Sequence, residues 1–157
     1  MTAKRLALFS LVLWCLTIGF IATKMINGHT MAGSDGRTAV ILSSADRDFV
    51  LGEMRTMLGA VHDVTMAIAA HDNAALADAA TSAGMVHAGH EPPGLLAALP
   101  LDFKKMGFGM HGAFDDLAKA ARSNTLSQSE QSAQLAGILQ RCIGCHASYR
   151  FEVPAAH

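Results

Sequence analysis

Cysteine, proline and net charge are all scarce in this chain of 157 residues. It has three cysteines and four prolines, and 12 basic against 13 acidic side chains leave a formal charge of −1. So balanced a charge gives no basic surface for nucleic acid and no strong attraction to anionic lipid. Alternating runs of β-branched residues are missing from the part beyond the N-terminus, where alanine, leucine and methionine are abundant. Helix is therefore the predicted state for most of the chain.

A long uncharged run, Leu6 to Thr23, lies at the N-terminus directly after Lys4 and Arg5. As a helix it is about 27 Å long, close to the thickness of the hydrocarbon core of a bilayer. The two basic residues place the N-terminus in the cytoplasm and the rest of the chain outside it. A cleaved signal segment is the alternative, although no small-residue cleavage site follows the run and Lys24 comes next. We predict an anchor or signal segment at residues 1–26, anchored by residues 6–23, on the periplasmic side of the inner membrane.

Residues 27–43 are predicted to be a linker, in which 37–42 lie extended against the domain, and residues 44–157 a single helical domain. Four segments carry apolar residues at spacings of three and four, which is the pattern of amphipathic helices. Ser43 or Ser44 caps the first and Ser127, with Glu130 three residues on, caps the last. The expected fold class is all-α, an antiparallel four-helix bundle. The helices are expected at about 45–70, Ala74 to about His87, 103–122 and from Ser127 onward.

The run Cys142-Ile143-Gly144-Cys145-His146 is typical of covalent haem attachment. Its two thiols add to the vinyl groups of the porphyrin, and the imidazole of His146 becomes the proximal ligand of the iron. A zinc site would need a second pair of ligands, yet the remaining cysteine, Cys15, lies in the distant apolar run. A redox C-x-x-C would open a helix after a strand, a pattern that this sequence lacks. We therefore expect one covalently attached haem c, held by Cys142, Cys145 and His146.

The motif stands on the last predicted helix and continues to Tyr149 and Arg150, and in this it resembles the class II c-type cytochromes, the cytochrome c prime family. The resemblance covers Ser44 to Arg150. It implies a four-helix bundle with the haem on the last helix and a first-helix residue on the other face of the iron. A methionine there is typical of low-spin members that transfer electrons, and an apolar residue is typical of five-coordinate members. Arg150 is a candidate to pair with a haem propionate or to shield the proximal imidazole, and a solvated position is the alternative for it.

Two methionines of the first helix are candidates for the distal ligand. Counting back from His71, where the first helix of the family ends, selects Met54, with Met57 one turn further on. A count anchored on Arg47 selects Leu51 instead and leaves the iron open. Methionine also fills helical cores without any ligand role, so all three readings stay open.

The function expected from these features is single-electron transfer by a membrane-tethered, periplasmic, mono-haem cytochrome. Its partners would be redox proteins of the periplasm or the membrane, and a homodimer is compatible with the resemblance. The alternative is a five-coordinate haem protein that binds nitric oxide or another small gas. No arrangement of nucleophile and general base stands out in the sequence, so we do not expect an enzyme.

Covalent attachment should depend on both thiols, because each forms its own bond to the porphyrin while His146 holds only the iron. In Cys142→Ala or Cys145→Ala, acidified solvent should extract most of the haem, whereas the parent chain retains it. Absorbance of the extract and of the protein pellet measures the partition. Full retention in the double variant would rule out the attachment site.

Overall fold

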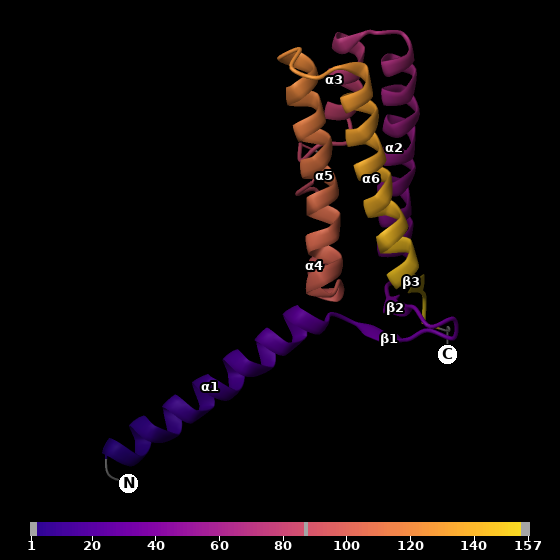
Figure 1. Cartoon of the computed structure of the whole chain (residues 1–157). Helices are drawn as coiled ribbons and strands as arrows, with labels where there is room; N and C mark the ends of the chain where they lie inside the picture. The colour runs from indigo at the N-terminus through magenta and orange to yellow at the C-terminus, as the bar shows by residue number, and fades with distance from the viewer. Residues whose placement is uncertain (1–2, 87, 155–157) are drawn as a thin grey trace.

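The computed structural model describes residues 3–86 and 88–154 (Figure 1). Residues 1–2 of the predicted anchor, His87 at the expected end of the second helix, and residues 155–157 lie outside the described range. Most of the described chain is helical. In chain order the elements are α1 (Ala3–Asn27), β1 (Thr30–Ala32), β2 (Thr38–Ile41), α2 (Ser44–Ala69), α3 (Asn73–Thr81), α4 (Leu95–Ala98), α5 (Leu101–Arg122), α6 (Gln128–Ser148) and β3 (Tyr149–Glu152).

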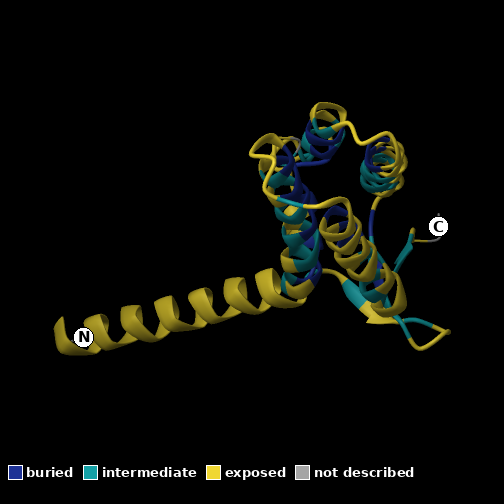
Figure 2. Cartoon of the chain, turned by 45° about the horizontal axis from the view of Figure 1, so that its top comes forward, coloured by how far each residue is buried: buried dark blue, intermediate teal, exposed yellow. Residues whose placement is uncertain are grey.

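Helix α1 is long and apolar enough to cross a membrane. None of its residues is buried, and it extends away from the other helices (Figures 1 and 2). A helix of apolar side chains exposed along its whole length is stable in lipid rather than in water. The predicted N-terminal apolar helix is thus confirmed, and its length and composition fit a retained anchor and a signal segment equally.

Both predicted N-cap serines begin their helices as expected, and the second forms a full capping box with Glu130. Ser43 is the N-cap of α2, where its Oγ accepts a hydrogen bond of 3.1 Å from the amide of Asp46. Ser127 is the N-cap of α6, where its amide donates to a carboxylate oxygen of Glu130 at 2.8 Å. Each cap satisfies an amide that the first helical turn leaves without a partner.

Helix α3 is shorter than predicted. It begins after Asp72, whose carboxylate accepts from the amides of Ala74 and Ala75, and it ends at Thr81 rather than near His87. The chain then turns so that the amide of Met85 donates to the carboxylate of Asp115 on α5 at 3.1 Å. This contact with α5 replaces the continuation that the alanine-rich sequence favours locally.

The helices bury their apolar stripes against one another. α3 contacts α2 and α5, and α6 contacts α5 and α2, so the long helices lie side by side (Figure 1). Fully buried side chains from α2, α3, α5 and α6 fill the core, among them Val64, Leu76, Phe114, Leu117 and Ile138. Burial of such side chains contributes roughly 1.5–3 kcal/mol each and is the main force holding these helices together.

The predicted linker differs most from expectation, because it carries two strands of a small sheet. β1 pairs antiparallel with β2, and β2 pairs parallel with β3, in the register Thr38 with Tyr149. The extended conformation expected for 37–42 is confirmed, and Val40 and Leu42 are buried. Tyr149, which we expected to continue the apolar stripe of the last helix, instead begins β3. The all-α class therefore needs correction to a mostly helical chain with one three-stranded sheet in the described part.

A second apolar cluster joins this sheet to the helices. Phe103 of α5 makes edge contacts with Tyr149 and Phe151, with ring centroids 5.3 and 5.7 Å apart. Leu95 and Leu99, in and beside α4, complete the cluster with Val40 and Leu42. α4 lies in a segment where Pro92, Pro93 and Pro100 favour an irregular connection between helices. The cluster holds the first turn of α5 next to the last turn of α6.

Core packing on α6 can be tested with two isoleucines of one helix. Ile138 is 2% exposed and Ile143 is 60% exposed. Ile138→Ala should lower the free energy of unfolding by about 2–5 kcal/mol, because it removes buried methyl groups and leaves a cavity. Ile143→Ala should change it by less than about 0.5 kcal/mol. Urea unfolding of the full chain in detergent, followed by circular dichroism, gives both values, and equal losses would contradict the burial of Ile138.

Candidate haem site

A cavity of about 510 Å³ lies between the lower halves of α2, α5 and α6, with α4 along one side. The volume is within the roughly 300–1,000 Å³ of pockets that hold cofactors and other small ligands. Leucine, methionine, phenylalanine and valine form most of its wall. The lining also includes sulfur-bearing, charged and imidazole side chains and one leucine of α2, namely Leu51, Glu53, Met54, Arg55, Met57, Lys104, Met106, His111, Arg141, Cys142, Cys145 and His146.

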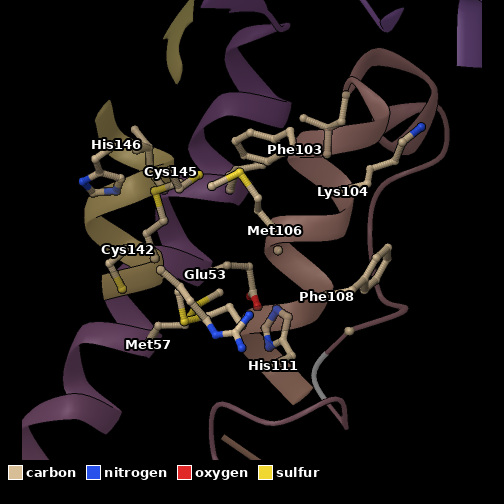
Figure 3. A pocket seen from close by; sticks show the side chains of 18 of the residues that line it. Glu53, Met57, Phe103, Lys104, Met106, Phe108, His111, Cys142, Cys145 and His146 are labelled. Carbon is tan, nitrogen blue, oxygen red and sulfur yellow. The ribbon is translucent and has the colours of Figure 1, made fainter. Parts of the chain in front are cut away.

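The motif residues lie on one wall of this cavity. Cys142, Cys145 and His146 all come from α6, and spacings of three and four put them on one face of a helix. Figure 3 shows the two cysteines beside the cavity, with the ring of His146 at its outer edge. Both thiols are free and half-buried, whereas His146 is exposed. The three motif residues therefore lie together along one wall of the cavity.

Burial governs the acid–base chemistry of the two thiols. Loss of solvent raises the pKa of Cys142 above its usual value, and the pKa of Cys145 is raised by burial and then by the neighbouring Cys142. Within residues 3–86 and 88–154, no three histidine, cysteine or acidic side chains come close enough together to hold a metal ion. A porphyrin brings four nitrogen ligands of its own and asks the protein only for axial ones, so this wall suits haem better than a bare ion.

Both candidate methionines line the cavity from α2 and are half-buried. Met54 packs against the same apolar cluster as Cys145, and Met57 packs against the same cluster as Cys142. Each methionine therefore shares an apolar cluster with one of the two cysteines. Leu51 also lines the cavity, whereas Arg47 is not among the lining residues.

Sequence reasoning missed Met106 as part of the site. Figure 3 shows Met106 and Phe103 extending from α5 toward the cysteine-bearing face of α6. The methyl carbon of Met106 would be 3.9 Å from a Cβ placed on Gly144, between the two cysteines. Its spacing from Phe103 and Met110 indicated only a core stripe.

His111 is a second residue whose surroundings only the structure reveals. It is 9% exposed, and its Nδ1 lies 2.8 Å from the carbonyl oxygen of Ala83. A carbonyl oxygen only accepts hydrogen bonds, so Nδ1 is the donor in this contact. The sequence favoured a surface or satisfied interface histidine over one that contacts haem, and His111 is a buried histidine whose hydrogen bond is satisfied by the Ala83 carbonyl; its side chain also lines the cavity.

Arg55, Lys104 and Arg141 line the cavity, whereas Arg150, the candidate partner of a haem propionate, does not. Arg150 forms ion pairs with Asp35 at 3.4 Å and with Glu152 at 3.2 Å, within and beside the sheet. The structure therefore brings Cys142, Cys145, His146, Met54 and Met57 to one cavity and leaves Arg150 outside it.

Arg37, just before β2, meets the end of the motif helix. Its Nη1 donates to the carbonyl oxygens of His146 at 3.2 Å and Tyr149 at 3.4 Å. Its Nε and Nη2 donate to one carboxylate oxygen of Asp35, at 2.9 and 2.6 Å. These bonds lower the pKa of Asp35 to about 2, chiefly through Arg37, with Arg150 adding a smaller effect. Asp35 is thus ionised at neutral pH and keeps the guanidinium in one orientation.

Comparison with known proteins finds no matching family model, no matching curated protein and no matching solved structure. A function is therefore inferred from the motif and from the cavity that it lines.

The raised pKa of the thiols predicts slow alkylation of the haem-free chain. Because less thiolate is present at a given pH, labelling of Cys142 and Cys145 by iodoacetamide should rise at higher pH in the folded chain than in urea. Mass spectrometry of the peptide that carries both residues, taken over a pH series, measures the rates. Identical pH profiles with and without urea would contradict the burial of the two thiols.

Proposed function

We propose that this chain is a membrane-tethered c-type cytochrome that transfers single electrons. One observation carries the proposal: both thiols of the C-x-x-C-H motif and its histidine lie on one wall of an apolar cavity of about 510 Å³. A motif occurring by chance on a helix would have no reason to face a cavity wide enough for a cofactor. A surface helix with the same residues would leave a porphyrin in water.

The residues at the cavity fit a haem in three respects. The thiols of Cys142 and Cys145 would hold the ring, and the imidazole of His146 would bind the iron. The apolar wall would cover the faces of the porphyrin, and the cations Arg55, Lys104 and Arg141 are available to its two carboxylates. They would take the role considered for Arg150. When bound, the haem supplies an iron that changes oxidation state by one electron.

The packing of the helices supports the antiparallel four-helix bundle of class II cytochromes as the finer description of the fold. Short connections reverse the chain between α2 and α3 and between α5 and α6 (Figure 1). Four helices of alternating direction would place the last helix opposite the first, with the cofactor between them. Contacts of α6 with α2 support the same arrangement.

Met54 is the distal ligand that these contacts favour. It shares its apolar cluster with Cys145, the residue next to His146, and it projects into the cavity from the opposite helix. A thioether ligand favours the ferrous state and keeps the iron six-coordinate in both oxidation states, so little rearrangement accompanies electron transfer. Met57, one turn further from His146, is the second choice.

The remaining parts of the proposal concern location. α1 would keep the cytochrome at the membrane, with the haem domain in the periplasm, where covalent haem attachment takes place. Its partners would be redox proteins of the periplasm or of the same membrane. An iron left open on the α2 side would favour the binding of nitric oxide or another small gas instead.

The Met54→Leu variant tests the proposal and separates the two functions. In the parent we expect a low-spin spectrum with the weak near-infrared sulfur-to-iron band. The variant should lose both, become high-spin, and show a reduction potential lower by about a tenth of a volt, within the roughly 0.8 V range that axial ligands set. Absorption spectroscopy and redox titration of the purified chain provide the measurement.

Two further variants of α2 complete the test: Met66→Leu is the control, and Met57→Leu tests the second candidate ligand. Met66→Leu changes a residue that is 57% exposed and lies outside the cavity wall, so it should leave the spectrum unchanged. Loss of the band in Met57→Leu instead would move the ligand by one turn and keep the function. A parent that is already high-spin and binds carbon monoxide readily would contradict electron transfer and favour the gas-binding alternative.

A further inference from the structure

The C-terminal end of α6 is completed by a residue that lies more than a hundred positions earlier in the chain. An α-helix leaves its last carbonyl groups without helical partners. Here the Cys145 carbonyl accepts from the amide of Tyr149, and the Gly144 carbonyl accepts from the hydroxyl of Ser148 at 2.9 Å. The carbonyl of His146 accepts from Nη1 of Arg37.

The fold leaves Arg37 little freedom to be elsewhere. Thr38 is paired with Tyr149 in the parallel ladder between β2 and β3, so the residue before Thr38 must lie beside the end of α6. The turn between β1 and β2 is closed by the amide of Gly33, which donates to the Arg37 carbonyl at 2.8 Å. A Cβ at position 33 would come within 2.5 Å of that same oxygen, so the turn requires glycine. Backbone pairing thus delivers the guanidinium to the residue that carries the imidazole.

The positive charge of Arg37 also stabilises the C-terminal end of α6. The carbonyl end of a helix carries partial negative charge, which a cation stabilises. Asp35 takes two of the guanidinium donors and leaves Nη1 directed at the carbonyls of His146 and Tyr149. A planar guanidinium can serve both sides at once in a fixed orientation, which an ammonium group cannot.

We propose that Arg37 is a positioning residue for the proximal ligand: it fixes the backbone of His146 and thereby the orientation of the imidazole toward the iron. The inference rests on the proposed haem function and adds a residue to it. The segment between the membrane helix and the domain is then a part of the redox site. Arg37 does not line the cavity, so its effect passes through the backbone of α6.

Arg37→Ala and Arg37→Lys in the full chain in detergent, loaded with haem, test this. All these chains, the parent and the control included, carry Met54→Leu, which is expected to leave the reduced iron five-coordinate, so that the iron–histidine stretching band in the resonance Raman spectrum reports the proximal imidazole directly. With alanine, the band should shift or broaden, and amide hydrogen exchange at residues 146–149 should speed up by about tenfold or more, as local opening becomes easier. Covalent haem content should stay at the level of the parent. Lysine restores the charge with a single donor group, so both readouts should lie between those of alanine and the parent.

Arg122→Ala is the matched control, because it removes an exposed guanidinium that donates to Thr81 at the far end of α5. It should leave both the band and the exchange at 146–149 unchanged. Faster exchange with an unchanged band in Arg37→Ala would make Arg37 a helix cap only and would overturn the proposal, as would an equal band shift in Arg122→Ala. Absence of covalent haem from the parent is a different result, which refutes the proposed function and the inference with it.

Discussion

The apolar packing around one cavity is the constraint on which the rest of this structure depends. A cavity of about 510 Å³ lies between the helices, and the apolar clusters beside it keep those helices in position. One cluster, centred on Phe114 and Leu117, lies beyond Cys142, and the other, centred on Phe103, lies beside Cys145. The thiols therefore stand where the two clusters meet. In the proposed cytochrome, the haem would complete a core that the polypeptide leaves unfinished.

Local sequence signals predicted the features that depend on local physics. Ser43 and Ser127 begin helices because a hydroxyl placed before a helix satisfies an amide of the first turn, whatever the rest of the chain does. The cysteines and His146 share one face because helical spacing alone requires it. The membrane-length helix followed from composition in the same way.

The features that escaped prediction depend on contacts between distant segments. β2 is a strand because it pairs with β3 and because Val40 and Leu42 are buried there. No residue near position 40 indicates that partner in the sequence. α3 ends early because Asp115, thirty positions later, binds the amide of Met85. Arg150 was assigned to the haem from its place after the motif, but the helix ends at Ser148, and the strand that follows carries Arg150 to Asp35. The helical spacing of apolar residues does not indicate the residue at which α6 ends.

The junction at Gly28 has a consequence for the geometry at the membrane. This residue has a φ of 60°, and a methyl group on it would come within 2.5 Å of the Ala98 carbonyl oxygen. Next to it, Lys104 of the cavity wall donates to the carbonyl of Met25, at the end of α1, at 2.9 Å. These contacts hold the end of α1 against α4 and α5. In the proposed membrane-tethered cytochrome, the tilt of α1 would therefore set the height of the cavity above the lipid headgroups, and a change in membrane thickness would change the electron-transfer distance.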